Sequence, residues 1–327
     1  MNPQIIDNFG RKHTYLRISL TDRCNLRCFY CMPEEGVELT DKQHIMTLEE
    51  IVGISERFVS LGVDTIRLTG GEPLIRKNVE TLIRELARLG VTLKLTTNGI
   101  VLDKFFDVLK EAGLRKINIS LDTLEKSKSV FITKRDYFYR ILDNIQKAIE
   151  HGFDIKLNIV LIKGVNDMEI NDFIGLTRKQ NIGIKFIEFM PFNGNNWDWK
   201  KGVSKEEILK AATFGYGGYK KLEDPKRSTS VNYQVKGFKG SFGIVSTITN
   251  PFCAGCNRIR LTADGKMKNC LFAASETDLL TPYRKGDSID EIILNSIKTK
   301  KFSRDGMDTE MEKSHYEKNR SMIKIGG

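Results

Sequence analysis

The sequence has 327 residues, which is long for one ordinary domain, and 40% of them are hydrophobic, enough to bury a sizeable core. Lysine and arginine number 52 against 42 aspartates and glutamates. The formal net charge of +10 excludes an acidic disordered protein and makes an anionic partner worth considering. No apolar run approaches the roughly 18–20 residues of a membrane helix, and the start lacks the apolar stretch of a secretory signal. We therefore expect a soluble, cytoplasmic globular protein.

Strand-like and helix-like stretches alternate along the first part of the chain. The first predicted helix begins at a capping box of Thr47 and Glu50 and ends near Gly62. Other predicted helices end near Gly90 and Gly113 or cover residues 137–151 and 168–180. The predicted strands are residues 15–20, 63–69, 91–96, 114–121, 153–161 and 183–189. Because helices connect successive strands, we expect six β-α units with a parallel sheet and right-handed crossovers.

Several of these strands alternate polar and apolar residues, unlike parallel strands that helices cover on both faces. Arg17 and Ser19 alternate with apolar residues in the first strand, as Lys156 and Asn158 do in the fifth. Successive side chains point to opposite faces, so one face can receive helices while the other is polar and cationic. We interpret the fold as an open, partial TIM-type barrel around an anionic ligand, since a complete barrel has an apolar interior. The alternative is an open sheet with one face in water.

The pattern changes after Met190. A loop over residues 191–202, a helix over 203–213 and a linker-like stretch over 215–227 come first. The rest predicts a smaller α+β domain, with a hairpin turn at Asp264-Gly265. Its short strands are residues 230–235, 241–249, 257–262 and 266–272, and residues 287–300 form a helix. We expect a barrel domain over residues 1–220 and a C-terminal domain over residues 221–327.

The six cysteines form two triplets with none left over. One comprises Cys24, Cys28 and Cys31, and the other comprises Cys253, Cys256 and Cys270. Disulfides are rare in the cytoplasm and three thiols cannot pair among themselves, so metal ligation is the better hypothesis. The first triplet follows the first strand, at the strand end where barrel enzymes keep their active sites. Its C-x3-C-x2-C spacing suits an iron–sulfur cluster with one iron left open; the alternative is a structural zinc site, which usually has four protein ligands.

The first triplet, with the aromatic Tyr30 before its last cysteine, resembles the radical S-adenosylmethionine (SAM) superfamily. The segment 70–73, Gly-Gly-Glu-Pro, agrees, because in that superfamily its glycines let the backbone approach the methionyl end of SAM; otherwise it is a tight turn. The second triplet, with Arg258 and Arg260 between its cysteines, resembles the GTP 3′,8-cyclase (MoaA) family of molybdenum cofactor biosynthesis. A zinc ribbon is the alternative there, but its fourth cysteine is missing. The resemblance covers nearly the whole chain.

The resemblance implies two [4Fe-4S] clusters, one on each triplet, with SAM bound at the first and GTP facing the second. The implied SAM contacts are Tyr30, Gly71, Ser120 and Met190. The implied GTP contacts are Arg17, which is also the implied catalytic residue, Arg67, Thr96, Lys156, Arg258, Ile259 and Arg260. Arginine binds phosphate oxygens in a planar fork, so the cations of the polar face suit a triphosphate; a surface salt bridge is the alternative for any one of them. At Lys185 the family often has arginine, so that role carries over weakly.

The implied activity is that of a radical SAM lyase. A 5′-deoxyadenosyl radical from SAM takes the 3′ hydrogen of GTP, and ring closure on C8 of guanine gives (8S)-3′,8-cyclo-7,8-dihydroguanosine 5′-triphosphate. The resemblance also implies an external electron donor, cyclic pyranopterin monophosphate synthase as the next enzyme, and a tail, Gly326-Gly327, that reaches into the active site. From residues alone, a disordered chain end is the alternative.

We expect no nucleic-acid or membrane partner and either a monomer or a homodimer. Two other functions stay open at this point. One is a radical SAM enzyme that modifies a peptide, which would need no cations for a triphosphate. The other is a zinc-binding RNA protein without enzymatic activity, suggested by the +10 charge, although the sequence contains no nucleic-acid-binding motif.

Overall fold

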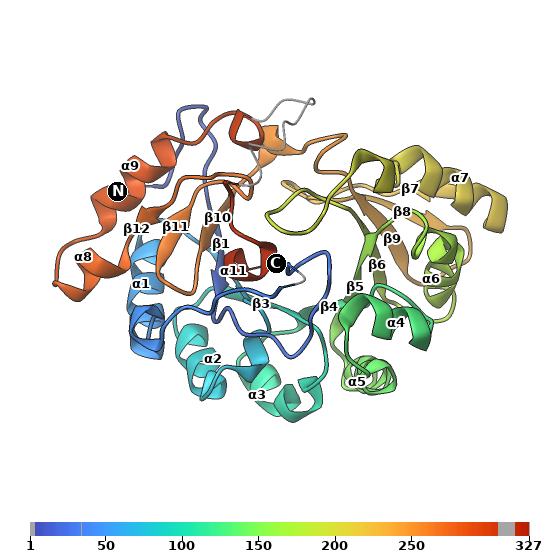
Figure 1. Ribbon diagram of the computed structural model, residues 1–327, viewed down its shortest axis with the longest axis horizontal. Coiled ribbons are helices and arrows are strands. Elements are labelled where there is room, and N and C mark those ends of the chain that lie inside the picture. The colour runs from blue at the N-terminus through green and yellow to red at the C-terminus, as the bar shows by residue number, and fades with distance from the viewer. Residues whose placement is uncertain (1–3, 34, 307–317, 327) are drawn as a thin grey trace.

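The computed structural model describes residues 4–33, 35–306 and 318–326. Its strands are β1 (Tyr15–Ser19), β2 (Thr65–Thr69), β3 (Thr92–Thr97), β4 (Lys116–Ser120), β5 (Asp154–Leu161), β6 (Gly183–Glu188), β7 (Tyr219–Lys221), β8 (Val231–Val235), β9 (Ser241–Val245), β10 (Arg258–Leu261), β11 (Lys266–Lys268) and β12 (Thr277–Asp278). They form one curved sheet in the order β12-β11-β10-β1-β2-β3-β4-β5-β6-β9-β8-β7 (Figure 1). The strands from β10 through β1–β6 to β9 run parallel, and the outer ones run antiparallel. This strand order begins at β12 and ends at β7, and these two strands are not paired with each other, so the sheet does not close into a complete barrel.

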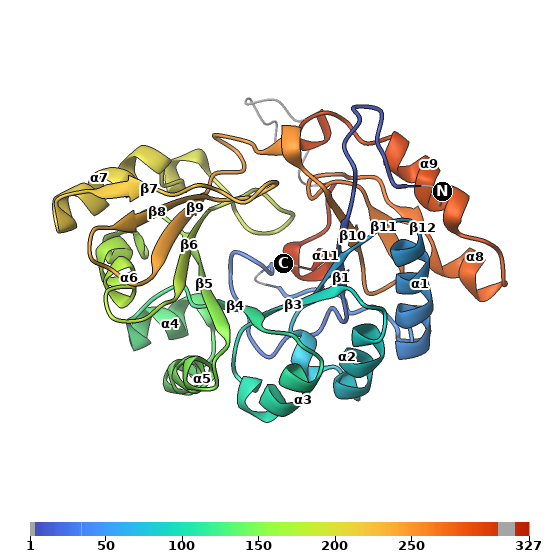
Figure 2. The same ribbon diagram turned by 180° about the vertical axis from the view of Figure 1, so that it is seen from behind.

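Helices cover the convex face of this sheet (Figures 1 and 2). The helices are α1 (Leu48–Ser60), α2 (Val79–Ala87), α3 (Phe106–Glu111), α4 (Lys126–Thr133), α5 (Phe138–Glu150), α6 (Ile170–Leu176), α7 (Lys205–Tyr216), α8 (Leu280–Arg284), α9 (Asp290–Lys298) and α11 (Met322–Ile325). The capping box predicted for α1 is present, with Glu50 N–H donating to Thr47 Oγ1 at 3.2 Å and Thr47 N–H donating to Glu50 Oε2 at 2.7 Å. The short α11 is different, because both views show it inside the curve of the sheet.

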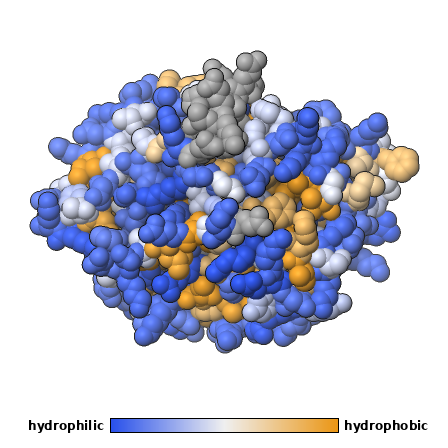
Figure 3. Space-filling model, in the orientation of Figure 1, coloured by the Kyte–Doolittle hydropathy of each residue, from blue (hydrophilic) through white to orange (hydrophobic). Residues whose placement is uncertain are grey.

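The core lies between the convex face of the sheet and the helices. Leu16 and Ile18 of β1 are fully buried there, as is Phe58 of α1. Burying one such side chain contributes roughly 1.5–3 kcal/mol. Buried and half-buried residues alternate along β4, β5 and β6, which confirms the predicted contrast between an apolar face and a polar face. The face seen in the space-filling view is mostly hydrophilic, with hydrophobic residues in separate groups (Figure 3).

The predicted fold class, an α/β partial barrel, is confirmed, but the sequence pattern missed several short elements, among them α4, α8 and β7. Helix α4 buries only Ser129, Ile132 and Thr133, so it lacks the apolar periodicity by which a helix is recognised. Helix α8 has five residues and contains Pro282. The segment predicted as a linker contains β7, which pairs antiparallel with β8.

The C-terminal strands extend the barrel sheet at both of its edges. Strand β9 pairs in parallel with β6, and β10 pairs in parallel with β1. An unpaired edge strand exposes backbone N–H and C=O groups. By pairing with β1 and β6, strands β10 and β9 provide hydrogen-bond partners for these groups at both edges of the six-stranded sheet. The division into residues 1–220 and 221–327 stays a prediction. In the part of the chain that the structure describes, every helix falls short of the length and hydropathy needed to cross a membrane.

Candidate functional site

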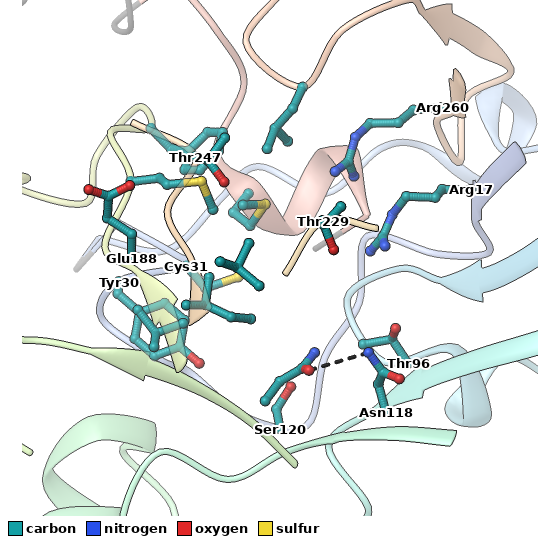
Figure 4. Close-up of a pocket in the computed structure, with 18 of the residues that line it drawn as sticks. Arg17, Tyr30, Cys31, Thr96, Asn118, Ser120, Glu188, Thr229, Thr247 and Arg260 are labelled. Atoms are coloured by element: carbon teal, nitrogen blue, oxygen red, sulfur yellow. Dashed lines mark hydrogen bonds between the residues drawn. The ribbon is translucent and has the colours of Figure 1, made fainter. Parts of the chain in front are cut away.

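A cavity of about 330 Å³ opens inside the curve of the sheet, and all six cysteines line it. Its wall combines the loop after β1, the inner ends of β3 to β6 and the C-terminal segment (Figure 4). The carboxyl ends of parallel barrel strands are the usual place for an active site. The fold thus brings two cysteine triplets, far apart in sequence, to one enclosed space.

The first triplet is held by its own loop and by the end of β3. Leu26 N–H donates to Cys24 Sγ at 3.4 Å, and Asn98 Nδ2 lies 3.8 Å from the same sulfur. Burial raises the pKa of Cys24 to about 11, and it raises the pKa of Cys28 well above its ordinary value. Thiolates at these positions therefore require a compensating positive charge, which the iron of a cluster provides.

The Gly-Gly-Glu-Pro turn packs directly against this cysteine loop. A Cβ on Gly71 would lie 2.2 Å from the carbonyl oxygen of Arg23, and one on Gly70 would lie 2.7 Å from that of Thr21. The turn is also hydrogen-bonded to the loop, with Gly71 N–H donating to Thr21 O at 2.7 Å. These contacts require glycine whatever ligand binds. Gly71 also lines the cavity, so its predicted role at SAM stays a prediction.

Tyr30, Ser120 and Met190, the other three predicted SAM contacts, also line the cavity. The Tyr30 hydroxyl donates to Asp122 Oδ2 at 2.7 Å, and burial raises the pKa of Asp122 to about 6. Asn195 Nδ2 donates to the carbonyl oxygens of Tyr30 at 3.2 Å and Met190 at 2.8 Å. Sequence reasoning missed both connecting residues, although Asp122 follows β4 at the strand end where site residues are expected.

The second triplet is surrounded by cations. Arg11 Nη1 donates to Cys253 O at 2.7 Å, while Lys300 Nζ lies 4.0 Å from Cys256 Sγ. Burial acts to raise the pKa of Cys256, but Lys300 and Arg258 hold it below its ordinary value. Arg11 and Lys300 were not predicted, because each is far in sequence from the cysteines that it contacts.

The donor sets suit iron–sulfur clusters. Each triplet offers three soft sulfur ligands, which iron–sulfur clusters prefer. Over the described ranges, no three His, Cys, Asp or Glu side chains are close enough together to share a single ion. A four-iron cluster does not require this, because its cysteines bind different irons.

Nine of the described residues that line the cavity are cationic, among them Arg17 of β1, Lys185 of β6, and Arg258 and Arg260 of β10. Arg17 and Arg260 lie side by side and point into the same space (Figure 4). Burial lowers the pKa of Arg260 to about 10. Burial and the nearby charges of Lys156 and Arg67 lower the pKa of Lys185 to about 7. Nη1 of Arg258 is buried without a hydrogen-bond partner in the described part of the chain. Buried like charges of this kind favour binding of an anion.

The chain end lies against two of these cations. The Gly326 carbonyl oxygen accepts from Arg260 Nη1 at 2.7 Å and from Arg17 Nη2 at 3.5 Å. Gly327, the other glycine of the predicted tail, lies outside the described residues.

The remaining predicted GTP contacts are placed differently. Thr96 lines the cavity, whereas Arg67, Lys156 and Ile259 do not. Arg67 is buried and donates to Tyr15 Oη at 2.6 Å and Thr96 Oγ1 at 3.1 Å. The Ile259 side chain is fully buried in the core, on the face of β10 opposite to both arginines.

Two asparagines of the polar face, neither of which was predicted to contact a ligand, complete the floor of the cavity. Asn118 Nδ2 donates to Asn158 Oδ1 at 3.3 Å (Figure 4). Both residues lie on the predicted polar face, so strand parity alone could have indicated them.

Two family matches divide the chain. Residues 18–177 match the radical SAM superfamily, and residues 182–305 match the family described as Molybdenum Cofactor Synthesis C.

Several relatives are similar over almost the whole chain. The mitochondrial GTP 3′,8-cyclase of Arabidopsis thaliana is 47% identical over 333 residues, covering 100% of this chain and 84% of that protein. The GTP 3′,8-cyclase of Peptoclostridium acidaminophilum is 44% identical, covering 99% and 98%. Molybdenum cofactor biosynthesis protein 1 of Mus musculus is 45% identical over 98% of this chain, which spans only 51% of that protein.

Among solved structures, Streptococcus suis SuiB bound to S-adenosylmethionine is similar in fold. The TM-score is 0.59 at 14% identity, with 84% of this chain and 67% of that chain covered. At this identity the similarity concerns the fold alone.

Proposed function

We infer how the cavity works from the premise that the chain belongs to the radical SAM superfamily and, within it, to the GTP 3′,8-cyclase family of molybdenum cofactor biosynthesis. It is an enzyme whose family uses SAM and iron–sulfur chemistry to cyclise GTP. The observation that supports our assignment of roles is that both cysteine triplets, Arg17 and Arg260 line one cavity.

Cys24, Cys28 and Cys31 are proposed to hold one [4Fe-4S] cluster, beside which SAM binds. When bound there, cluster and SAM supply the radical chemistry, which side chains cannot perform. Tyr30, whose hydroxyl is fixed by Asp122, and Met190, whose carbonyl is fixed by Asn195, form the wall on this side. Ser120 and Gly71 complete it. These residues orient SAM and exclude water from it.

Cys253, Cys256 and Cys270 are proposed to hold a second [4Fe-4S] cluster, which faces the guanine of GTP. Arg17, Arg258 and Arg260 bind the anionic part of the nucleotide, with Lys185 beside them and Thr96 at the strand end. Arg17 contacts substrate and is the proposed catalytic residue. Charge-assisted hydrogen bonds of arginine to phosphate are among the strongest that proteins make.

Three predicted contacts receive modified roles. Arg67 supports the site by holding Thr96 and Tyr15. Lys156 acts through its charge, because it helps to lower the pKa of Lys185. Ile259 contributes by burying its side chain in the core, which directs the two flanking arginines into the cavity.

The proposed product is (8S)-3′,8-cyclo-7,8-dihydroguanosine 5′-triphosphate. Its formation requires an external electron donor, and cyclic pyranopterin monophosphate synthase is the proposed next enzyme. A monomer or a homodimer would serve equally, because both triplets line the cavity of one chain.

Anaerobic reconstitution followed by incubation with SAM, dithionite and GTP tests this function. We expect 5′-deoxyadenosine together with an isomer of GTP detected by mass spectrometry, and no isomer when ATP replaces GTP. If 5′-deoxyadenosine forms without any GTP isomer, the substrate assignment is wrong, and a radical SAM enzyme acting on a peptide becomes the better hypothesis.

A further inference from the structure

The end of the chain is built into the cavity wall. Helix α11 lies within the curve of the sheet, and Met322 lines the cavity. The Gly326 carbonyl accepts from both Arg17 and Arg260, and a Cβ on Gly326 would lie 2.5 Å from Thr69 Oγ1. Gly326 therefore has little space around it, whereas the last residues of a chain are usually poorly ordered unless other contacts hold them. Something must therefore hold the segment in place.

Arg320 makes the most extensive polar contact of this segment. Its Nη1 and Nη2 donate to the two carboxylate oxygens of Asp264, each at 2.9 Å, and Nη2 also contacts Glu276. All three side chains are largely buried, with 23% exposure for Arg320, 14% for Asp264 and 11% for Glu276. Such a two-point, partly desolvated contact is much stronger than an exposed ion pair.

Lys268 extends this network to the loop that carries Cys270. Its side chain is fully buried, and Nζ donates to Asn319 Oδ1 at 3.0 Å and to the carbonyl oxygen of Ala273. Asn319 in turn donates through Nδ2 to Leu271 O at 3.1 Å. The partners on the loop thus directly follow the last cysteine of the second triplet.

Apolar contacts continue the connection toward the first triplet's side of the cavity. Ile325 is buried in a small cluster with Phe192, Ile248 and Phe272, separate from the main core. Cys270 and Met190 pack against the same cluster. The tail is therefore bracketed between the Cys270 loop and the loop after β6.

We propose that Arg320 is a positioning residue, which with Asn319, Lys268, Asp264 and Glu276 forms a latch that holds the chain end and the Cys270 loop together. The latch keeps Gly326 against Arg17 and Arg260, where the nucleotide is proposed to bind. This role rests on the proposed function, but the latch itself can be tested without it.

The test compares Arg320→Ala with Arg284→Ala as a matched control. Arg284 also makes a two-point contact with one carboxylate, through Nε and Nη2 to Glu50 at 2.7 and 3.1 Å, but away from the cavity. In the anaerobically reconstituted protein, amide hydrogen exchange over residues 318–326 should accelerate at least about tenfold in Arg320→Ala and stay unchanged in Arg284→Ala. Unchanged exchange in Arg320→Ala would overturn the latch.

The reconstituted enzyme tests the positioning role. Arg320→Ala should cleave SAM at the wild-type rate while GTP product per 5′-deoxyadenosine falls about tenfold. Arg320→Lys, which keeps the charge and loses the planar fork, should restore part of this coupling. Faster exchange with unchanged coupling would overturn the positioning role.

Two further outcomes, a variant that does not fold and a wild-type enzyme without GTP product, also lead to a clear result. If Arg320→Ala does not fold, Arg320→Lys and Asp264→Asn provide the same two measurements with smaller changes. If the wild-type enzyme makes no GTP product, the proposed function fails, and the exchange measurement still decides whether the latch exists.

Discussion

Lys185 lies among other cations in the wall of the cavity, and its surroundings lower the pKa of its ammonium group. Burial, together with Lys156 and Arg67, lowers its pKa to about 7. In the folded protein the charged form is therefore disfavoured above about pH 7, and the side chain is protonated as the pH falls below it. A bound anion would favour the charged form and raise the pKa again.

This predicts a pH dependence for nucleotide binding. Between about pH 6 and 8, GTP affinity should fall as the pH rises, because Lys185 loses its proton. In Lys185→Arg the charge persists throughout, so the pH dependence of its GTP affinity should be smaller. Isothermal titration at several pH values measures both proteins. Identical pH profiles would contradict the role of Lys185.

Arg260 carries a second prediction at the residue scale. Loss of one charge-assisted contact costs about 1.5–3 kcal/mol, so Arg260→Ala should weaken GTP binding roughly ten- to hundredfold. Guanosine, which lacks phosphates, should bind weakly to the wild type and be affected much less by the substitution. Equal losses for GTP and guanosine would show that Arg260 does not meet the phosphates.

The sequence predicted residues whose role follows from their own chemistry or strand parity. The cysteines, Arg17 and Arg260 belong to this group, and all line the cavity. Asn195 and Lys300 could not be predicted, since Asn195 reaches the backbone carbonyl of Tyr30 and Lys300 reaches the sulfur of Cys256, both far away in the chain.

At the scale of elements, the turn after β2 and the loop after β1 behave as one unit. Gly71→Ala should therefore force the backbone of Arg23 to move, because the new Cβ would lie 2.2 Å from its carbonyl oxygen. We expect loss of the first cluster, seen as about half of the iron of the wild type after anaerobic reconstitution.

Gly255→Ala is the matched control for this prediction. Gly255 lies between Cys253 and Cys256, its backbone is not left-handed, and a Cβ there meets no atom within 4 Å. It should bind iron as the wild type does. Full iron content in Gly71→Ala would mean that the loop tolerates the displacement.

Elements with clear periodicity or caps, such as α1 and the alternating strands, were predicted correctly. Helix α4 and strand β7 were not, because neighbouring elements stabilise them more than their own sequence does. Strand β7 has three residues, two of them exposed lysines, and it forms by pairing with β8.

At the scale of the whole molecule, the two edges of the barrel sheet depend on the C-terminal part of the chain. Residues 1–220 alone would expose β1 and β6, whose partners β10 and β9 would be missing. We expect this fragment to aggregate, because exposed parallel edges offer unpaired backbone groups to other chains. Size-exclusion chromatography of the fragment and the full chain tests this, and a stable monomeric fragment would contradict it.

The central claim is that one cavity brings SAM and GTP together, and transfer of a labelled hydrogen tests it most directly. GTP deuterated at C3′ is incubated anaerobically with the reconstituted enzyme, SAM and dithionite. We predict that deuterium appears in 5′-deoxyadenosine in proportion to the cyclised product. Unlabelled 5′-deoxyadenosine beside full product yield would show that the hydrogen does not pass between the two ligands, and it would contradict the account.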